Sequence, residues 1–347
     1  MTATTRPPRW PRSFAFVLIK DFSMMPFTAA IEPLRAANRM AGRTLYEWST
    51  LSKDGAPVRA SNGAVIQVDG MLRLIGLADA VVVCAGINAY DHRDSDLAAQ
   101  LRRASRQGAM IGSVCSGSIV LADAGLLDGR RCTGHWEDLE TLAENYPTLD
   151  VTKSIYEFDG NRFTCSGGTA PLDLMLHFIA EDFGRDLAAQ VADQMLHHAA
   201  RAAAGPQRLA LSERTGVRHP GLLDVIAAME ANLENPLPLP ALAEIAGLSL
   251  RQLERLFAAQ LGDRPAAHYR SMRLGRARQL VRQTGLSMLE VAVATGFSSA
   301  PHFAREYRRT FGCAPSRDRT AMGPARYLFN RSACQRTCSA IKVDTNS

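Results

Sequence analysis

LAEIAGLS at residues 242–249 is repeated as VAVATGFS at residues 291–298, at an offset of 49. Downstream of each stretch, apolar and turn residues recur at an offset of 50, since Leu253, Phe257, Leu261, Gly262 and Pro265 match Phe303, Tyr307, Phe311, Gly312 and Pro315. Each copy predicts a short helix, a turn that contains glycine, and a second helix. The repeat therefore indicates that one structural unit occurs twice in the second half of the chain.

Each copy has the residues that a helix-turn-helix unit requires. Alanine where the two helices cross lets them approach closely, glycine takes up the sharp turn, and serine caps the helix that follows. The second helix of such a unit can lie in the major groove of DNA. An Arg-rich helix predicted over residues 269–281 joins the two copies, so we expect an all-α domain with two reading helices.

The second copy also carries a longer pattern of fixed spacings, formed by Ala292, Gly296-Phe297, Phe303, Tyr307, Phe311-Gly312 and Pro315. Over residues 222–322, this pattern and the repeat resemble the DNA-binding domain of the AraC/XylS family of transcription activators. In that family, two helix-turn-helix units are joined by a linker helix. The resemblance implies that residues 221–322 form an AraC-type DNA-binding domain.

The outward positions of the two second helices are the candidates for base contacts. In the first helix, which starts at Ser249, the apolar seam leaves four side chains outward: Arg251, Gln252, Glu254 and Arg255. In the second helix the outward side chains are Pro301, His302, Arg305 and Arg309. Arginine reads guanine and glutamine reads adenine. The predicted DNA-binding residues are Arg251, Gln252, Arg255, Ser299, His302 and Arg305.

Four arginines of the joining helix are predicted to contact phosphates or to hold the fold together, namely Arg270, Arg273, Arg276 and Arg278. A solvated surface is the alternative for each of them.

The first half of the chain alternates strand-like and helix-like segments. Strands are predicted at residues 13–19, 80–85 and 110–114, and helices at 28–40, 94–107, 116–124, 172–183 and 187–198. This alternation predicts an α/β fold, a doubly wound, mostly parallel sheet of the flavodoxin-like kind. Functional groups in such folds gather at the carboxyl ends of the strands.

Cys115 lies where one of these strands runs directly into a helix, in the sequence MIGSVCSGS at residues 110–118. Small residues crowd both sides of Cys115, as a tight strand-to-helix elbow requires, and a helix N-terminus favours the thiolate. His135 follows in the sequence TGHWE at residues 133–137. A cysteine and a histidine near the ends of adjacent strands are what a thiol hydrolase or an amidotransferase needs.

This stretch resembles the class I glutamine amidotransferase-like superfamily, in its PfpI/ThiJ branch. Its continuation, ADAGLLDG at residues 122–129 and the segment from Cys132 to Trp136, resembles the sensor domain of GlxA-type AraC regulators. The likeness extends from Phe14 to about His198 and includes EPLR at residues 32–35 and GGTA at residues 167–170. Together, the two resemblances cover most of the chain.

Enzymes of the PfpI branch carry a glutamate in the loop after the first strand, close to the thiol. Residues 21–27 contain no glutamate, and Pro26 or a neighbour takes that place. We therefore interpret Cys115 and His135 as a vestigial site that now helps to bind a ligand. Genuine hydrolysis by a Cys-dependent hydrolase or amidase, and a redox-sensing thiol, are the alternatives.

The predicted ligand-binding residues are Cys115, Ser116, His135, Trp136 and Glu137. Backbone amides at Cys115 and Ser116 can hold a carboxylate, and Trp136 beside Glu137 can hold a quaternary ammonium. For Trp136, a partly buried core position is the alternative. The GlxA-type subgroup responds to arginine, carnitine or glycine betaine, so the resemblance also implies a small nitrogenous metabolite.

The net charge also differs between the two parts of this chain of 347 residues. Residues 1–220 hold 23 Lys+Arg and 24 Asp+Glu, a net charge of −1, whereas residues 221–330 hold 14 and 9, a net charge of +5. A basic module suits a polyanion such as DNA. The predicted organisation is a leader (1–12), a sensor domain (13–203), a linker (204–220), the DNA-binding domain (221–322) and a tail (323–347).

The remaining expectations concern location, cofactors and partners. Seven cysteines without a CxxC pair indicate a reduced, cytoplasmic protein with neither structural disulfides nor a metal site. The longest apolar run near the start, residues 14–19, is too short to span a membrane. We expect no cofactor, and we expect as partners a small-molecule effector, RNA polymerase, a second copy in a homodimer, and double-stranded DNA with direct-repeat half-sites.

Overall fold

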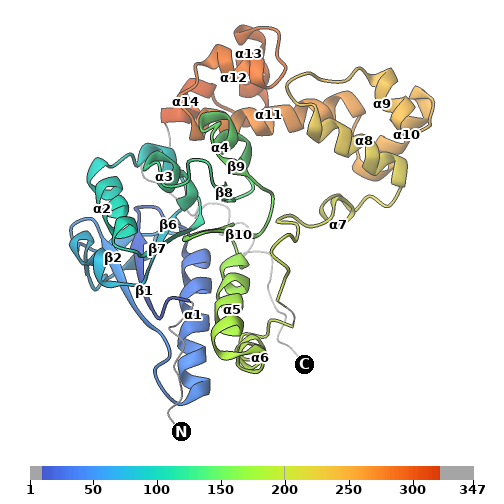
Figure 1. Cartoon of the computed structure of the whole chain (residues 1–347). Helices are drawn as coiled ribbons and strands as arrows, with labels where there is room; N and C mark the ends of the chain where they lie inside the picture. Colours follow the sequence, from blue (N-terminus) through green and yellow to red (C-terminus); the bar gives the residue numbers. More distant parts are fainter. Residues whose placement is uncertain (1–9, 199, 321–347) are drawn as a thin grey trace, which may run out of the picture.

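The computed structural model describes residues 10–198 and 200–320, with an α/β half followed by a helical half (Figure 1). Most of the predicted leader and the predicted tail lie outside the described residues. Residues 10–12 are not a loose leader, because the ring of Trp10 packs 5.2 Å from that of Phe178 and Arg12 pairs with Asp182 at 3.5 Å. The aromatic side chain thereby anchors the start of the first strand.

A seven-stranded sheet forms the centre of the α/β half. Its strand order is β10 (Tyr156–Asp159), β11 (Arg162–Cys165), β7 (Met110–Cys115), β6 (Ala80–Ala85), β1 (Ser13–Leu18), β2 (Glu47–Ser52) and β5 (Gly70–Met71). Every pair is parallel except β10 with β11, so the prediction of a mostly parallel sheet is confirmed. Two short pairs lie outside the sheet: β3 (Val58–Arg59) with β4 (Val65–Ile66), and β8 (Arg131–Cys132) with β9 (Asp150–Val151).

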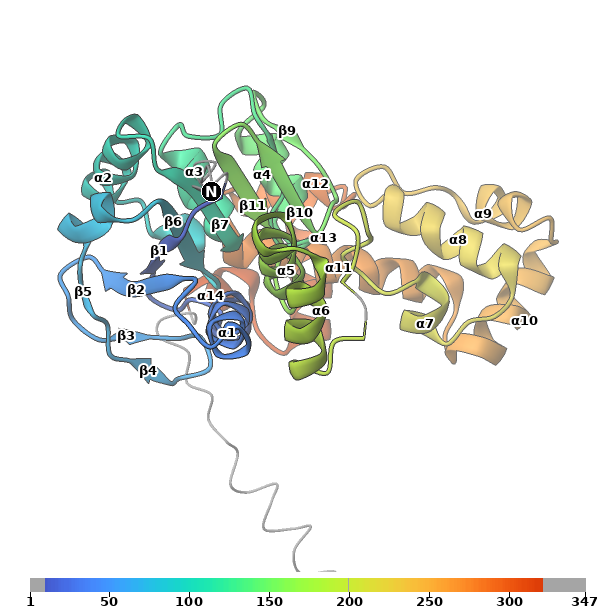
Figure 2. The ribbon, with the colours of Figure 1, turned by 60° about the horizontal axis from the view of Figure 1, so that its bottom comes forward.

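Helices cover both faces of this sheet (Figure 2). One face packs against α1 (Met24–Ala41) and α5 (Ala170–Phe183), on which α6 (Arg185–Gln194) packs in turn. The other face packs against α2 (Ser95–Arg106) and α3 (Gly117–Asp123). Alternate residues of β1 enter the two apolar cores, since Phe14 and Phe16 face the first and Ala15 and Val17 the second. A strand buried on both faces needs the continuous apolar sequence that β1 and β6 have.

The helical half holds the two repeats. The first unit is α9 (Leu239–Ile245) with α10 (Leu250–Leu261), and the second is α12 (Met288–Ala294) with α13 (Ala300–Phe311). Between them runs α11 (Pro265–Gln283), with α8 (Pro220–Ala231) packed on the first unit and α14 (Pro315–Thr320) on the second. The structure therefore confirms the predicted pair of helix-turn-helix units joined by one long helix.

The change of offset from 49 to 50 has a structural cause. Ser249 caps α10 directly after Gly247-Leu248, whereas α13 is capped by Ser299, one position later than Ser298. The second turn therefore contains one residue more than the first. In both units the turn glycine has a positive φ, +65° at Gly247 and +71° at Gly296, a conformation that glycine adopts without a steric penalty.

The segment between the halves contains more order than the sequence suggested. A short helix, α7 (Leu211–Thr215), lies within it, and Val217 is buried in the core of the first repeat. Gln207 donates hydrogen bonds to the Ser154 carbonyl at 2.8 Å and to Thr133 Oγ1 at 3.0 Å. These contacts tie one end of the segment to each half. Among the described residues, no helix is long and apolar enough to cross a membrane.

Candidate functional site

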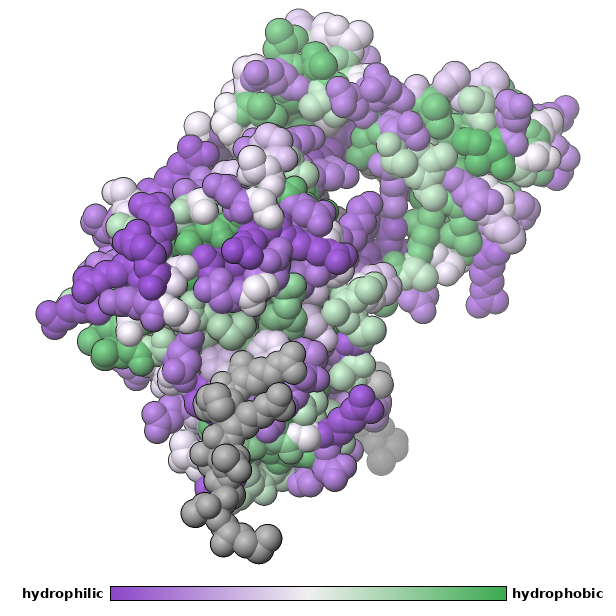
Figure 3. Space-filling model, viewed as in Figure 1, coloured by the Kyte–Doolittle hydropathy of each residue, from purple (hydrophilic) through white to green (hydrophobic). Residues whose placement is uncertain are grey.

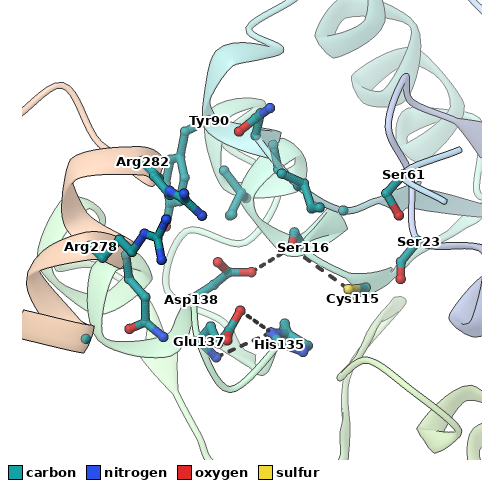
Figure 4. A pocket seen from close by; sticks show the side chains of 17 residues that line it. Ser23, Ser61, Tyr90, Cys115, Ser116, His135, Glu137, Asp138, Arg278 and Arg282 are labelled. Carbon is teal, nitrogen blue, oxygen red and sulfur yellow. Dashed lines mark hydrogen bonds and ion pairs between the residues drawn. The ribbon is translucent and has the colours of Figure 1, made fainter. Parts of the chain in front are cut away.

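A cavity of about 410 Å³ lies at the carboxyl ends of β1, β6 and β7. Figure 4 shows its lining side chains, with Cys115, Ser23 and Ser61 at one end and Arg278 and Arg282 at the other. The size suits a small metabolite. The position is the one that a doubly wound sheet favours, because the loops after neighbouring parallel strands meet at the same edge.

Cys115 forms the elbow at which β7 ends and α3 begins. Its φ of +57° is rare for a residue with a side chain, and its side chain is almost fully buried. Burial, followed by the nearby Asp138 carboxylate, raises the pKa of Cys115 to about 12. The expectation that the helix terminus favours a thiolate is therefore wrong, since desolvation and a neighbouring negative charge outweigh it.

His135 lies beside Cys115, and no hydrogen bond joins the two side chains among the described residues. Both side chains approach the Cα of Gly167, where an added Cβ would lie 2.5 Å from His135 Cδ2 and 3.3 Å from Cys115 Sγ. Among the described residues, the thiol's side-chain partner is Ser116 Oγ at 3.9 Å rather than the imidazole. Nucleophilic catalysis needs a base that can reach the thiol, and in this structure the thiol contacts Ser116 instead.

Of the other four predicted ligand-binding residues, three line the cavity and one does not. Ser116, His135 and Glu137 line it. Trp136 does not, because its ring packs under the guanidinium of Arg208, 4.4 Å from the ring centroid to Cζ. The guanidinium of Arg208 thus already occupies one face of the Trp136 ring. This position does not match the expectation that Trp136 contacts the ligand.

The lining residues of the α/β half that the sequence did not single out include Ser23, Ser61, Tyr90 and Asp138. Ser23 follows β1, where enzymes of the PfpI branch place a glutamate, and Tyr90 follows β6. Asp138 follows Glu137 in the sequence, and Glu137 is one of the predicted ligand-binding residues. The rule that functional groups follow the carboxyl ends of strands was the signal that would have found Ser23 and Tyr90.

Asp138 is the most buried acid of the cavity. Ser116 Oγ donates a hydrogen bond to Asp138 Oδ2 at 2.7 Å. Burial raises the pKa of this carboxyl, whereas the Ser116 hydrogen bond and the nearby His135 oppose the shift. A buried carboxylate with one hydrogen bond gains from any cation that approaches it. The α/β end of the cavity therefore favours a positively charged group.

In α10, the predicted reading residues lie on the exposed side, opposite the buried Leu253 and Phe257. Arg251 and Arg255 are exposed. Gln252 is exposed too, but its Oε1 accepts hydrogen bonds from the backbone N–H and the hydroxyl of Ser249, each at 2.8 Å. Gln252 thus closes the capping box of α10, and its carbonyl oxygen is already occupied.

In α13, Arg305 is exposed, whereas His302 is half-buried with its ring centroid 5.7 Å from that of Phe297. Ser299 caps the helix, since its hydroxyl accepts from the backbone N–H of His302 at 3.4 Å. Arg309 pairs with Glu306 at 2.6 Å. Of the outward residues predicted for this helix, Arg305 is therefore the arginine without an ion pair among the described residues.

The four arginines of α11 that the sequence singled out all make contacts within the protein. Arg273 donates to the carbonyls of Thr295 and Gly296 and lies over the ring of Phe297, which holds the second turn in place. The other three form ion pairs: Arg270 with Glu306 at 3.5 Å, Arg276 with Glu140 at 2.9 Å and Arg278 with Asp318 at 2.9 Å. Among the three possibilities left open by the sequence, namely phosphate contact, structural contact and a solvated surface, these contacts favour the structural one.

Comparisons with known proteins match both halves. The model of the DJ-1/PfpI family matches residues 12–181, and a model described as a helix-turn-helix domain matches residues 242–321. The HTH-type transcriptional regulator CdhR of Pseudomonas aeruginosa is 45% identical over 90% of this chain and 92% of its own length. The HTH-type transcriptional regulator GlxA of Rhizobium meliloti is 42% identical over 89% and 95%.

A solved structure agrees with these matches. The crystal structure of an AraC family transcriptional regulator from Pseudomonas putida is 26% identical, covers 53% of this chain and 100% of that chain, and superposes with a TM-score of 0.50.

Proposed function

The chain belongs to the family of HTH-type transcriptional regulators in which a DJ-1/PfpI domain precedes an AraC-type DNA-binding domain, and we propose that it is an activator controlled by a small nitrogenous metabolite. The observation that carries the proposal is a cavity at the carboxyl ends of the α/β strands, in a chain that also has two helix-turn-helix units. The effector would act by binding two arrangements of the protein unequally.

AraC-type regulators bind DNA, and we assign base contacts in this chain to α10 and α13. Two units within one subunit can occupy successive major-groove segments on one face of the duplex, so we propose direct-repeat half-sites rather than a palindrome. Arg251, Arg255 and Arg305 are the exposed residues that support this assignment. Selection of duplexes by the full-length protein, followed by footprinting, tests it: a single palindrome would contradict the proposal.

We propose that the effector binds among Cys115, Ser116, His135 and Glu137. The burial of Asp138 beside them supports a ligand with a positively charged group. Thermal-shift measurements against amino acids, betaines, carnitine and polyamines test this, because a ligand that binds the folded state raises the apparent stability. Failure of every such compound to raise the melting temperature would contradict the class of effector.

We propose that catalysis has been lost. The raised pKa of Cys115, together with the missing hydrogen bond to His135 among the described residues, supports this. The alternative is a Cys-dependent hydrolase fused to a DNA-binding domain. Cys115→Ala separates the two: activation by the effector should persist in the variant, whereas loss of activation together with measurable turnover by the wild-type protein would favour the enzyme.

Two partners complete the proposal. We propose that the protein acts as a homodimer and that it contacts RNA polymerase. Leu289 and Val293 support a protein contact at the second unit, because both are apolar side chains more than half exposed on α12. Sedimentation of the full-length protein tests the dimer, and transcription from a selected promoter by Leu289→Ser tests the polymerase contact.

A further inference from the structure

Helix α11 of the DNA-binding domain forms one wall of the cavity. Gly275, Arg278, Gln279 and Arg282 line it together with residues of the α/β half. These positions lie three and four residues apart, so they share one face of the helix. The opposite face, with Leu274, Ala277 and Val281, packs in the core of the second unit. Residues of both domains therefore form the walls of the cavity.

The two sides of the cavity carry opposite charges. Glu137 and Asp138 contribute carboxylates from the α/β half, and Arg278 and Arg282 contribute guanidinium groups from α11. Figure 4 shows the two arginines reaching in from one side toward Asp138 and Glu137, which lie between them and Cys115. A small molecule with a carboxylate at one end and a cationic nitrogen at the other matches this distribution of charge.

The cavity also contains polar atoms that the described residues leave without a hydrogen-bond partner. Arg282 Nε and Tyr90 Oη are both buried, and neither is bonded to another atom of the described residues. Both residues line the cavity. Buried donors of this kind are costly unless a water molecule or a ligand satisfies them. A ligand carboxylate beside Arg282 would accept from such a donor.

The same arginines are bound to an acid of their own domain. Arg278 Nε and Arg282 Nη2 donate to Asp318 at 2.9 and 2.8 Å, and Tyr307 of α13 donates to the same carboxylate at 2.7 Å. A ligand carboxylate would therefore share the guanidinium groups with Asp318. This links the cavity through one residue to the helix that reads the second DNA segment.

The contact between the halves is polar. Each of the four apolar clusters of the described residues lies within one half, whereas Arg276 reaches Glu140 across the junction. On the face shown in Figure 3, hydrophilic residues predominate where the halves meet. Because interfaces of this kind permit relative motion, contacts that a ligand adds across the junction can decide which arrangement is favoured.

We propose that the cavity binds a zwitterionic metabolite across the two domains, with its carboxylate held by Arg278 and Arg282 and its cationic group held by Glu137 and Asp138. This inference rests on the proposed function and adds that the DNA-binding domain itself supplies half of the effector site. The effector thereby fixes α11, and with it both reading helices, against the α/β half.

Calorimetric titration of the full-length protein tests the proposal with two matched pairs of probes. Glycine betaine is compared with choline, and L-arginine with agmatine, since the second member of each pair lacks the carboxylate. We expect the member without a carboxylate to bind about tenfold more weakly or worse, as loss of a charge-assisted contact implies. Equal binding within both pairs would overturn the proposal and leave the sensor function standing.

Two substitutions test whether Arg282 binds the ligand carboxylate or only stabilises its own domain by pairing with Asp318. Arg282→Gln and Asp318→Asn break the same ion pair, yet they should shift the affinity for the bound zwitterion in opposite directions. Arg282→Gln should weaken binding about tenfold, and Asp318→Asn should tighten it severalfold, because the competing carboxylate is removed. Arg278→Gln replaces Arg282→Gln if that variant fails to fold.

The outcomes distinguish the two proposals. Weaker binding in both Arg282→Gln and Asp318→Asn, or unchanged binding in both, would overturn the role of α11 while the effector site in the α/β half stands. Failure of glycine betaine and L-arginine to bind the wild-type protein would overturn the zwitterion site together with the proposed class of effector.

Discussion

Arg276 of α11 and Glu140 of α4 (Leu139–Asn145) form a 2.9 Å ion pair that joins the DNA-binding domain to the α/β half. The arginine side chain is 11% exposed and the glutamate side chain 68% exposed. Because water reaches the carboxylate so freely, the pair contributes little to the stability of either half. Its importance lies in where it acts, next to the cavity that both domains line.

Glu140→Gln should loosen the junction without unfolding either half. An exposed ion pair is worth about 0.2–1 kcal/mol, so tryptic cleavage within residues 204–220 should become about two- to fivefold faster, while the melting temperature stays the same. Glu144→Gln is the matched control, because Glu144 lies on the same helix, is exposed and has no ion pair among the described residues. Equal cleavage rates in the two variants would show that the pair does not hold the junction.

Arg255→Ala should weaken binding to a selected duplex by about 1–3 kcal/mol, the usual value of a bidentate base contact. Fluorescence anisotropy at fixed salt gives the affinity, and base preference at one position should relax with it. Gln260→Ala is the control, because Gln260 is exposed near the end of the same helix, away from the first turns that reach base edges. An unchanged affinity and footprint for Arg255→Ala would refute the assignment.

The Cys115 thiol should react slowly with iodoacetamide at neutral pH. With a pKa raised to about 12 by burial, the thiol stays protonated at neutral pH, so the rate should rise about tenfold for each pH unit from 7 to 10. Mass spectrometry of the peptide that contains Cys115 measures the rate, and Cys115→Ser identifies the peptide. A rate that levels off below pH 8 would instead indicate an activated nucleophile.

Gly117→Ala should destabilise the α/β half. A Cβ at residue 117 would lie 2.3 Å from the carbonyl oxygen of Val83, a backbone atom of β6 that cannot turn away. Overpacking of this kind costs about 1–3 kcal/mol or more, measured by denaturant unfolding. Gly275→Ala is the contrasting change in α11, because apart from its chain neighbours and the backbone of its own helix no described atom lies within 4 Å of its added Cβ. It should stabilise the helix by about 0.5–1 kcal/mol.

Asp318→Asn should destabilise the helical half in a pH-dependent manner. Burial alone would raise the pKa of Asp318, but hydrogen bonds from Arg282, Tyr307 and Arg278 outweigh it and lower the pKa below its usual value. A carboxyl whose pKa is lowered by folding stabilises the protein above its unfolded pKa, and this contribution is lost as the pH falls through the lowered value.

The difference in unfolding free energy between the wild-type protein and Asp318→Asn should therefore be about 2 kcal/mol at pH 7 and should shrink below pH 4. Far-UV circular dichroism during urea unfolding provides the measurement. Asp224→Asn serves as the control because Asp224 is exposed on α8. A difference that stays constant down to pH 3 would show that the ionised form of Asp318 is not the stabilising one.

Several features of the fold followed from local sequence. β1, β6 and β7 are apolar runs in the sequence, as strands buried on both faces must be. Each of their predicted ends lies within one residue of the end in the structure. The strands β2, β10 and β11 were missed. β10 is an edge strand and β2 adjoins the edge strand β5, and polar residues such as Glu47 and Glu157 interrupt their pattern; β11 is buried but only four residues long, and two of these are Arg162 and Thr164. In the sequence, the extra residue before α13 appears only as the change of the repeat offset from 49 to 50. The structure gives the cause, because Ser299 rather than Ser298 caps the helix.

The sequence by itself determined the two helix-turn-helix units, the α/β sheet and the elbow at Cys115, because periodicity, capping residues and turn glycines act over a few neighbouring positions. Only the tertiary structure decided what surrounds Cys115. It placed Trp136 under Arg208, brought Asp138 against Ser116, and carried Arg278 and Arg282 of α11 to the cavity. The residues that line the cavity lie up to 259 positions apart, from Ser23 to Arg282, and no local rule reports which distant side chains will share one buried space.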